Sequence, residues 1–162
     1  MALEDLAKSL IQLLLEKHLT IATAESCTGG LIATLLTEIP GASKTYVGSI
    51  ISYSNQMKIK WLGVEPAVLE RYGAVSQETV EQMVKGLLIT SGADVGVSVS
   101  GIAGPTGGTS EKPIGTVYVS ANVKNVAVTK KHLFEGDRHS IRMQSAEKAL
   151  SLVHELVNNS SL

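Results

Sequence analysis

The chain of 162 residues carries 14 basic and 15 acidic side chains, and this balance excludes the extended basic surface that binds DNA or RNA. Its single cysteine excludes an internal disulfide and its four histidines lack the spacing of a metal site, which predicts a metal-free protein of the reducing cytoplasm. Residues 1–162 suffice for one compact core, and no apolar run approaches the roughly 20 residues of a membrane span, so we predict a single domain without membrane contact.

Hydrophobic periodicity predicts that helices and strands alternate along most of the chain. In chain order, the expected elements are helix 3–18, strand 20–24, helix 28–38, strand 46–53, helix 55–62, a helical segment ending near 72, helix 77–90, strand 93–100, strands 114–123 and 126–134, and a long helix that follows 136–137. This order predicts an α/β fold, with a mixed β-sheet between two layers of helices in a three-layer α/β/α sandwich.

Polar and turn-forming residues mark several of the predicted boundaries. Ser76 and Asp137 are expected N-caps, because a short side chain with an oxygen atom can accept a hydrogen bond from a free amide of the first helical turn. Lys124 and Asn125 lie between the last two predicted strands, which indicates a tight antiparallel hairpin.

The segment AESCTGG at residues 24–30 lies between a predicted strand and a predicted helix. The free amides at the start of such a helix can bind an anion or the oxyanion of an acyl-transfer transition state. Ser26 and Thr28 are therefore candidate reactive groups or ordinary helix caps, and residue type alone leaves both interpretations open. Neighbouring side chains on an extended segment face opposite ways, so we expect only one of Ser26 and Cys27 to face a site.

Tyr53 and Lys58 form a second candidate cluster. A lysine can act as a base when burial lowers its pKa, as in the Ser-Lys variants of serine hydrolases. From composition alone, an aromatic residue at a strand end followed by a surface lysine is the more common arrangement. His139, just after a predicted helix cap, is the histidine that we retain as a rival base.

Two further clusters are suited to anion binding. The glycine-rich loop 101–109 exposes main-chain amides, although it matches neither a P-loop nor a dinucleotide-binding motif, and its glycines can equally serve tight turns. Arg138 and Arg142 lie one turn apart near the start of the last predicted helix, where a cation opposes the helix dipole. Either a bound anion or a neighbouring carboxylate, Glu135 or Asp137, can compensate this charge.

Four segments together resemble one protein family. They are AESCTGG at 24–30, YSNQMK at 53–58, SGIAGPTGG and KPIGTVY between 100 and 118, and GDRHSIR at 136–142. In this order, over nearly the whole chain, they are similar to the carboxy-terminal domain of the competence/damage-inducible protein CinA and to its stand-alone form, the nicotinamide mononucleotide deamidase PncC. The larger CinA proteins carry an additional amino-terminal domain, so we expect this chain to correspond to the deamidase unit alone.

The resemblance implies hydrolysis of the carboxamide of nicotinamide mononucleotide to nicotinic acid mononucleotide and ammonia, in pyridine-nucleotide salvage. It implies a Ser-Lys amidase without metal or cofactor, in which Ser26 is the nucleophile, Lys58 the base and Tyr53 an auxiliary hydroxyl. The residues implied to bind the substrate are Cys27, Thr28, Gly29 and Gly30 of the turn, Thr106 and Gly107 of the glycine-rich loop, and Arg142.

Two points remain open at the level of sequence. A non-catalytic module that binds a phosphorylated nucleotide would need the anion site but not Lys58, and it is the alternative function. The resemblance also implies a homo-oligomer, although no heptad or extended apolar face in the sequence indicates which surface would pair.

Overall fold

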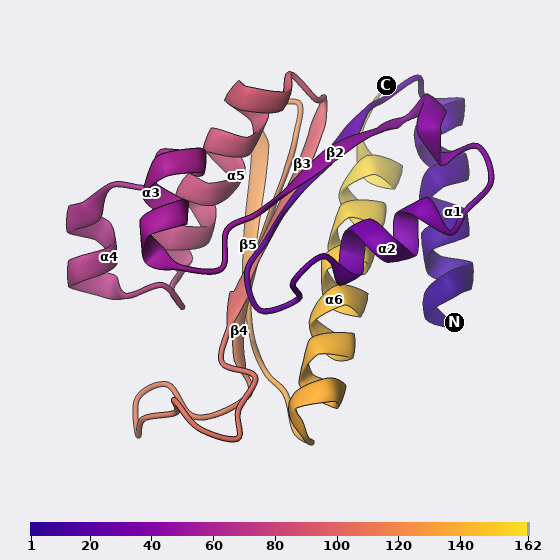
Figure 1. The fold of residues 1–162 in the computed structure, drawn as a ribbon. Helices are drawn as coiled ribbons and strands as arrows, with labels where there is room; N and C mark the ends of the chain where they lie inside the picture. Colours follow the sequence, from indigo (N-terminus) through magenta and orange to yellow (C-terminus); the bar gives the residue numbers. More distant parts are fainter. Residues whose placement is uncertain (162) are drawn as a thin grey trace.

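The computed structural model describes residues 1–161. A five-stranded sheet in the order β2-β1-β3-β4-β5 runs through the molecule, with helices on both faces (Figure 1). β1 (Ile21–Glu25) is parallel to its neighbours β2 (Tyr46–Ile51) and β3 (Val95–Gly101), whereas β4 (Thr116–Val123) and β5 (Val126–Leu133) extend the sheet in antiparallel fashion. The predicted α/β sandwich with a mixed sheet is confirmed.

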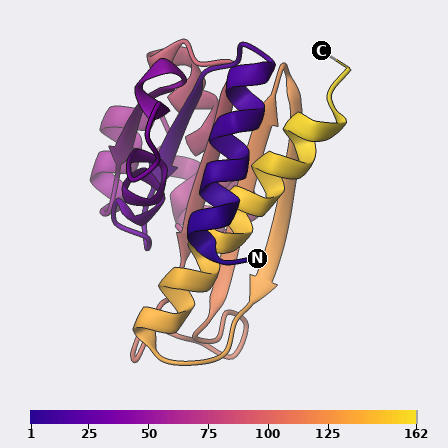
Figure 2. The same cartoon turned by 90° about the vertical axis from the view of Figure 1, so that its right-hand side faces the viewer.

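Three helices cover each face of the sheet. On one face, α6 packs on β3 and β4 and against α1, and Figure 2 shows these two helices in front of the strands. On the other face, α5 packs on the central strands and supports α3 and α4. The helices are α1 (Leu3–Glu16), α2 (Leu31–Thr37) and α6 (Arg138–Asn159) on the first face, and α3 (Asn55–Leu62), α4 (Pro66–Tyr72) and α5 (Gln77–Ser91) on the second.

Small residues on one face of the sheet allow the α5 layer to approach closely. Ala22 and Ala24 of β1 pack in the core beneath α5, whereas the larger Ile21 packs in the core beneath α1, α2 and α6. A Cβ atom on Gly86 of α5 would lie 1.7 Å from the carbonyl oxygen of Leu62 at the end of α3. Only glycine therefore permits this contact between α5 and α3, the helix that carries Lys58.

Both predicted caps and the predicted hairpin are confirmed. The side chain of Ser76 accepts a hydrogen bond from the Thr79 amide, and Asp137 accepts one of 2.8 Å from the Ser140 amide. Lys124 and Asn125 have φ angles of 48° and 67°, the left-handed values that a two-residue hairpin turn requires.

Several predicted boundaries differ from the structure by one to three residues, and one short element was not predicted. The second helix begins at Leu31 rather than at residue 28, because Gly29 and Gly30 have φ angles of 59° and 102°, outside the helical region. β2 ends at Ile51 instead of 53, and a short 3₁₀ helix over Ala42–Lys44 was not predicted. Within residues 1–161, no helix combines the length and the apolar character needed to cross a membrane.

Candidate active site

The candidate site lies where the three parallel strands reach their carboxyl ends. The Ser26 amide donates to the carbonyl oxygen of Val99 at 3.0 Å, so Ser26 continues the pairing of β1 with β3. On the opposite side, the Ser52 amide donates to the carbonyl oxygen of Glu25 at 3.0 Å. Loops that follow adjacent parallel strands converge in this way at one edge of an α/β sheet, which is where such folds usually bind ligands.

Lys58 reaches Ser26 from the first turn of α3. The Ser54 hydroxyl caps this helix by accepting a hydrogen bond from the Met57 amide at 3.2 Å. Lys58 Nζ then lies 2.8 Å from Ser26 Oγ and also donates to the carbonyl oxygens of Ser52, at 2.8 Å, and Tyr53, at 3.1 Å. Two side chains that are 32 residues apart in the sequence are therefore in direct contact.

Lys58 is a buried lysine, so its interpretation as a surface residue is wrong. Its side chain is 1% exposed, and burial lowers its pKa from 10.5 to about 8 because the ammonium form loses solvation. As an ammonium ion, Nζ donates to all three neighbouring oxygen atoms. As a neutral amine, it retains two hydrogens for the two carbonyl oxygens, and its lone pair can accept the proton of Ser26.

The Ser26 hydroxyl contacts Lys58, whereas Cys27 belongs to the hydrophobic core, although both residues contribute to the lining of one cavity. Cys27 packs in the hydrophobic core with residues of α6. Burial raises the pKa of this thiol to about 11. Because the thiolate is the nucleophilic form of cysteine, the thiol is unreactive near neutral pH.

Substitution Cys27→Ala is therefore expected to keep most of the activity of the protein. Alanine retains the main-chain amide of residue 27, and the change removes only a buried sulfur atom, at a cost in stability of about 1 kcal/mol. The turnover number of the variant and its midpoint of thermal unfolding, measured beside wild type, check this prediction. Loss of turnover in folded Cys27→Ala, together with turnover retained in Ser26→Ala, would instead make the thiol the nucleophile.

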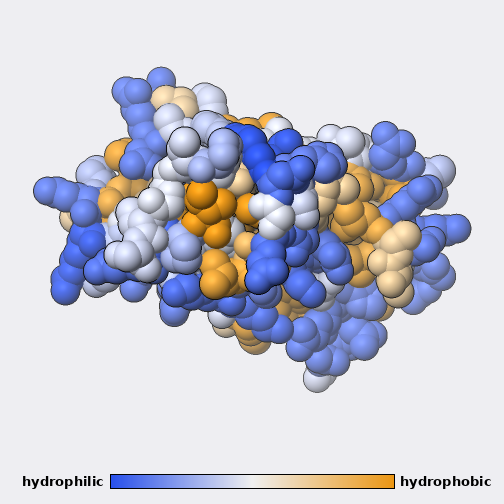
Figure 3. All heavy atoms as spheres, turned by 90° about the horizontal axis from the view of Figure 1, so that it is seen from below, coloured by the Kyte–Doolittle hydropathy of each residue, from blue (hydrophilic) through white to orange (hydrophobic). Residues whose placement is uncertain are grey.

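A cavity of about 260 Å³ opens beside the Ser26–Lys58 pair. Hydrophobic surface surrounded by hydrophilic side chains marks this end of the molecule (Figure 3). The lining residues come from the turn after β1, the segment from Tyr53 into α3, the loop between α4 and α5, the end of β3 with the glycine-rich loop, and the start of α6. They are Ser26, Cys27, Tyr53, Lys58, Ala74, Val75, Ser100, Gly101, Ile102, Ala103, Gly104, Thr106, Gly107 and Arg138. The tertiary structure thus brings residues of all four sequence clusters into contact with one cavity.

Arg138 borders this cavity, and the sequence-based choice of site residues omitted it. Its guanidinium donates to the carbonyl oxygen of Gly104 at 2.8 Å and to the Tyr53 hydroxyl at 3.0 Å. Arg138 thereby connects the glycine-rich loop to Tyr53, whose main-chain oxygen accepts from Lys58. Its place beside a Gly-Asp helix start was a usable signal, but spacing could not separate it from Arg142.

Arg142 lies behind the turn and is not among the cavity-lining residues. Its Nε donates to the carbonyl oxygen of Cys27 at 3.0 Å and its Nη2 to that of Thr28 at 2.9 Å. These carbonyl oxygens, rather than Glu135 or Asp137, are the partners recorded for Arg142 within residues 1–161. Substrate contact by Arg142 stays a prediction from the resemblance.

Of the other residues predicted to bind the substrate, some line the cavity and some do not. Thr106 and Gly107 of the glycine-rich loop line the cavity. Thr28 is fully buried, and its hydroxyl donates to Glu25 at 2.7 Å, so it does not cap α2. The Gly29 amide donates to the Ser26 carbonyl oxygen at 3.1 Å and closes the turn, while Gly30 precedes the first residue of α2.

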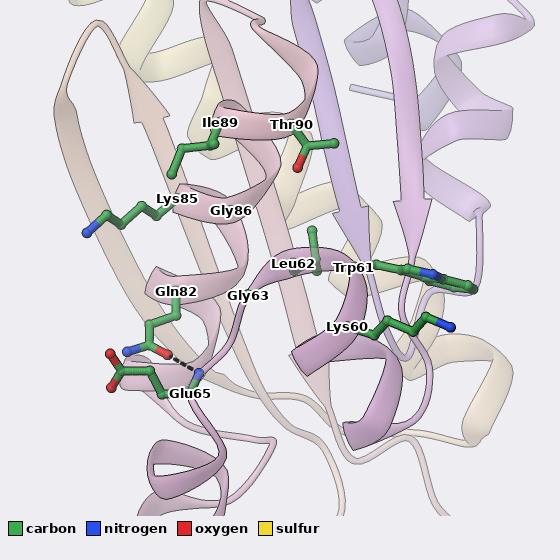
Figure 4. A pocket seen from close by; sticks show the side chains of 10 residues that line it. All are labelled: Lys60, Trp61, Leu62, Gly63, Glu65, Gln82, Lys85, Gly86, Ile89 and Thr90. Atoms are coloured by element: carbon green, nitrogen blue, oxygen red, sulfur yellow. Dashed lines mark hydrogen bonds between the residues drawn. The ribbon is translucent and has the colours of Figure 1, made fainter.

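A larger hollow of about 380 Å³ lies elsewhere, between the end of α3 and α5 (Figure 4). Lys85 and Ile89 extend from α5, Trp61 extends from α3, and the Gln82 side chain accepts a hydrogen bond from the Glu65 amide. The hydrogen bond within its lining joins the Glu65 amide to Gln82, whereas the smaller cavity holds the contact between Ser26 and Lys58, so volume alone does not select the functional site. Among residues 1–161, no cluster of three or more His, Cys, Asp or Glu side chains is arranged to hold a metal ion.

The family model of the CinA C-terminal domain matches residues 3–157. The chain belongs to the CinA C-terminal domain family. It is 47% identical over 150 residues to a CinA-like protein of Kosmotoga olearia, and 50% identical over 135 residues to one of Fusobacterium nucleatum. These matches cover 93% and 83% of the chain but only 36% and 33% of the relatives, so the chain spans about a third of their length.

Solved structures of the CinA superfamily share the whole fold. A competence-damaged protein (CinA) superfamily protein from Klebsiella pneumoniae is 29% identical, with a TM-score of 0.95, and the match covers 99% of this chain and all of that chain. A competence/damage inducible protein from Agrobacterium tumefaciens is 38% identical, with a TM-score of 0.93 over 97% and 96% of the two chains. The described residues therefore share the fold of these CinA superfamily structures.

Proposed function

We propose that this CinA domain is an amidase that hydrolyses the carboxamide of nicotinamide mononucleotide to nicotinic acid mononucleotide and ammonia. The observation that carries the proposal is the 2.8 Å contact between Ser26 Oγ and the buried Lys58 Nζ at the edge of a cavity. A buried lysine that contacts a hydroxyl group fits proton abstraction, because burial favours its neutral form. The motif resemblance supplies the substrate.

The first half of the reaction forms an acyl-enzyme. Ser26 Oγ attacks the carboxamide carbon while neutral Lys58 accepts the hydroxyl proton, and a tetrahedral oxyanion forms. Main-chain amides of the turn at Cys27 and Thr28 are the proposed donors to this oxyanion. Protonated Lys58 then gives the proton to the departing nitrogen, the C–N bond breaks, and ammonia leaves.

The second half restores the enzyme. Neutral Lys58 accepts a proton from a water molecule whose oxygen attacks the ester carbon, and the proton returns to Ser26 Oγ when the C–O bond breaks. The Tyr53 hydroxyl, which accepts a hydrogen bond from Arg138, is the proposed auxiliary group that relays a proton or positions the lysine. No step needs a metal or a redox cofactor, since an amide and water contain every atom of the products.

The far side of the cavity fits an anionic group on the substrate. Arg138 carries a permanent positive charge, and Thr106 and Gly107 belong to a loop whose main chain and hydroxyl can donate to phosphate oxygens. A ligand with a carboxamide at one end and a phosphate at the other can therefore span from Ser26 to the loop. This charge favours the nucleotide over free nicotinamide.

We expect activity to rise with pH through an apparent pKa of about 8. Burial depresses the pKa of Lys58, so the lysine is mostly protonated below that value and mostly neutral above it. At pH 7 only about one molecule in ten holds the neutral base. A profile of kcat/KM between pH 6 and pH 9.5 checks this prediction, and a rate that falls as pH rises would contradict a lysine base.

The deciding experiment measures ammonia release from nicotinamide mononucleotide and, in parallel, from nicotinamide. Release from the nucleotide that greatly exceeds release from nicotinamide supports the proposed reaction and the role of the phosphate site. Calorimetric binding of the nucleotide without ammonia over hours would support the alternative, a non-catalytic nucleotide-binding module. Release from nicotinamide alone would exclude the proposed substrate.

A further inference from the structure

A fully buried carboxylate lies directly before the nucleophile. Glu25 is 0% exposed, and its oxygen atoms accept four hydrogen bonds. Oε1 accepts from the Thr28 hydroxyl at 2.7 Å and the Ile32 amide at 2.9 Å. Oε2 accepts from the Ala33 amide at 3.0 Å and the Thr23 hydroxyl at 3.3 Å. Four donors match the acceptor capacity of an ionised carboxylate, which offers no hydrogen of its own.

These contacts make Glu25 the anchor of the segment that follows Ser26. Gly30, the N-cap of α2, has no side chain to satisfy the first free amides of the helix, and Glu25 accepts from two of them. The carboxylate binds at the positive end of the helix, where a negative charge is favoured. The residue before the nucleophile therefore determines where α2 begins and how the turn closes.

Glu25 also connects the turn to the strand that leads to Lys58. The hydroxyl that donates to Oε2, that of Thr23, is hydrogen-bonded to Ser49 of β2, which in turn contacts the Tyr46 hydroxyl. The main-chain oxygen of Glu25 accepts from the Ser52 amide, and the Ser52 carbonyl oxygen is one of the two that hold Nζ. Glu25 thus links the turn that carries Ser26 to the segment whose carbonyl oxygens hold Lys58 Nζ.

Arg142 binds the same turn through its carbonyl oxygens, whereas Glu25 binds amides and hydroxyls. Its guanidinium donates to two consecutive carbonyl oxygens, of Cys27 and Thr28, in a forked geometry. An anion therefore binds amides and a hydroxyl on one side of the turn, and a cation binds carbonyl oxygens on the other. A turn with both sets of polar groups satisfied has few alternative conformations.

We propose that Glu25 and Arg142 are positioning residues that together hold the 26–30 turn so that Ser26 Oγ faces Lys58. This inference rests on the proposed function only for its kinetic readout. Neither side chain lines the cavity, so each acts on the reaction through the main chain of the turn. Displacement of a reactive group by about 1 Å can cost about 100-fold in rate, which sets the size of the expected effect.

The test compares Glu25→Gln and Arg142→Lys with wild type. Glutamine keeps the shape of Glu25 but presents an N–H group to donors, and lysine keeps the charge of Arg142 but not its fork. For both variants we expect kcat to fall by about 100-fold while KM stays within about twofold. Ser98→Ala, which removes a buried hydrogen bond of 2.6 Å to Val80 on the other face of the sheet, is the control expected to retain activity.

A second readout does not depend on the amide substrate. Wild type and variants are treated with an aryl sulfonyl fluoride, and the rate of covalent labelling at Ser26 is followed by mass spectrometry. We expect the labelling rate to fall in the same proportion as kcat, while thermal unfolding reports whether each variant is folded. If Glu25→Gln does not fold, Arg142→Lys and Thr28→Val, which removes only the hydroxyl donor to Glu25, decide the result.

The outcomes separate this inference from the proposed function. A raised KM with unchanged kcat in Arg142→Lys would make Arg142 a substrate contact and overturn the inference. Unchanged labelling in folded variants would overturn it as well. A wild-type protein that is labelled at Ser26 but releases no ammonia would reject the proposed reaction, and the labelling rates alone would then decide the positioning role. A protein that is neither labelled nor active would reject both.

Discussion

Substitution Ser26→Ala is expected to lower the rate of ammonia release from nicotinamide mononucleotide by about 10⁴-fold or more. Without Oγ no ester intermediate can form, and water would have to attack the resistant amide directly. The residual rate would come from the remaining donors of the turn. A stopped assay for ammonia with a detection limit well below that level measures the effect.

The controls for this variant distinguish loss of chemistry from loss of structure. Ser98→Ala removes another buried serine hydroxyl and should remain active. Calorimetry should show that Ser26→Ala still binds the nucleotide, because Arg138 and the glycine-rich loop are unchanged. Near-normal ammonia release from purified Ser26→Ala would remove Ser26 from the mechanism.

Substitution Lys58→Met is expected to cause a loss of similar size, about 10³-fold or more, because nucleophile and base act as one unit. Methionine keeps most of the buried length of the side chain without an amine, so the packing of α3 on α5 is retained. The serine hydroxyl would then have no group to accept its proton. Steady-state kinetics together with thermal unfolding measure the two effects separately.

Two further variants sharpen the test of the base. Lys58→Arg keeps the positive charge, but a guanidinium does not deprotonate in proteins, so turnover should be lost at every pH. Lys60→Met changes an exposed lysine of the same helix and should leave kcat and the pH profile unchanged. Substantial activity in Lys58→Arg would mean that the charge of residue 58, and not its ability to accept a proton, matters.

Most of the fold could be predicted because local patterns carry it. The span predicted for α3, residues 55–62, agrees with the structure, because a Ser54 cap and a Gly63 end are both local signals. The start of α2 was misplaced because its capping group, the Glu25 carboxylate, comes from the preceding strand and not from Ser26 or Thr28, the caps that the sequence offered as one interpretation. Tertiary contacts of this kind leave no periodic signal in the sequence.

In the candidate site, too, sequence motifs predicted some features and tertiary packing decided the others. Motif order indicated Ser26, Lys58 and the glycine-rich loop, and the structure brings them to one cavity. Composition favoured an exposed Lys58, and its burial became evident only once α3 was packed against α5. Arg138 and Arg142, four residues apart, could not be separated by spacing, because one borders the cavity and the other binds the back of the turn.

The sequence by itself determined the order of helices and strands, the caps at Ser76 and Asp137 and the family to which the chain belongs. Element order and caps depend on interactions within a few residues, and family membership depends on motifs that can be read directly from the sequence. Only the tertiary structure decided that Lys58 is buried beside Ser26, that the Cys27 thiol faces the core and that Glu25 and Arg142 hold the turn. Burial and the charge state of an amine depend on neighbours that are distant in the chain, and packing alone brings those neighbours together.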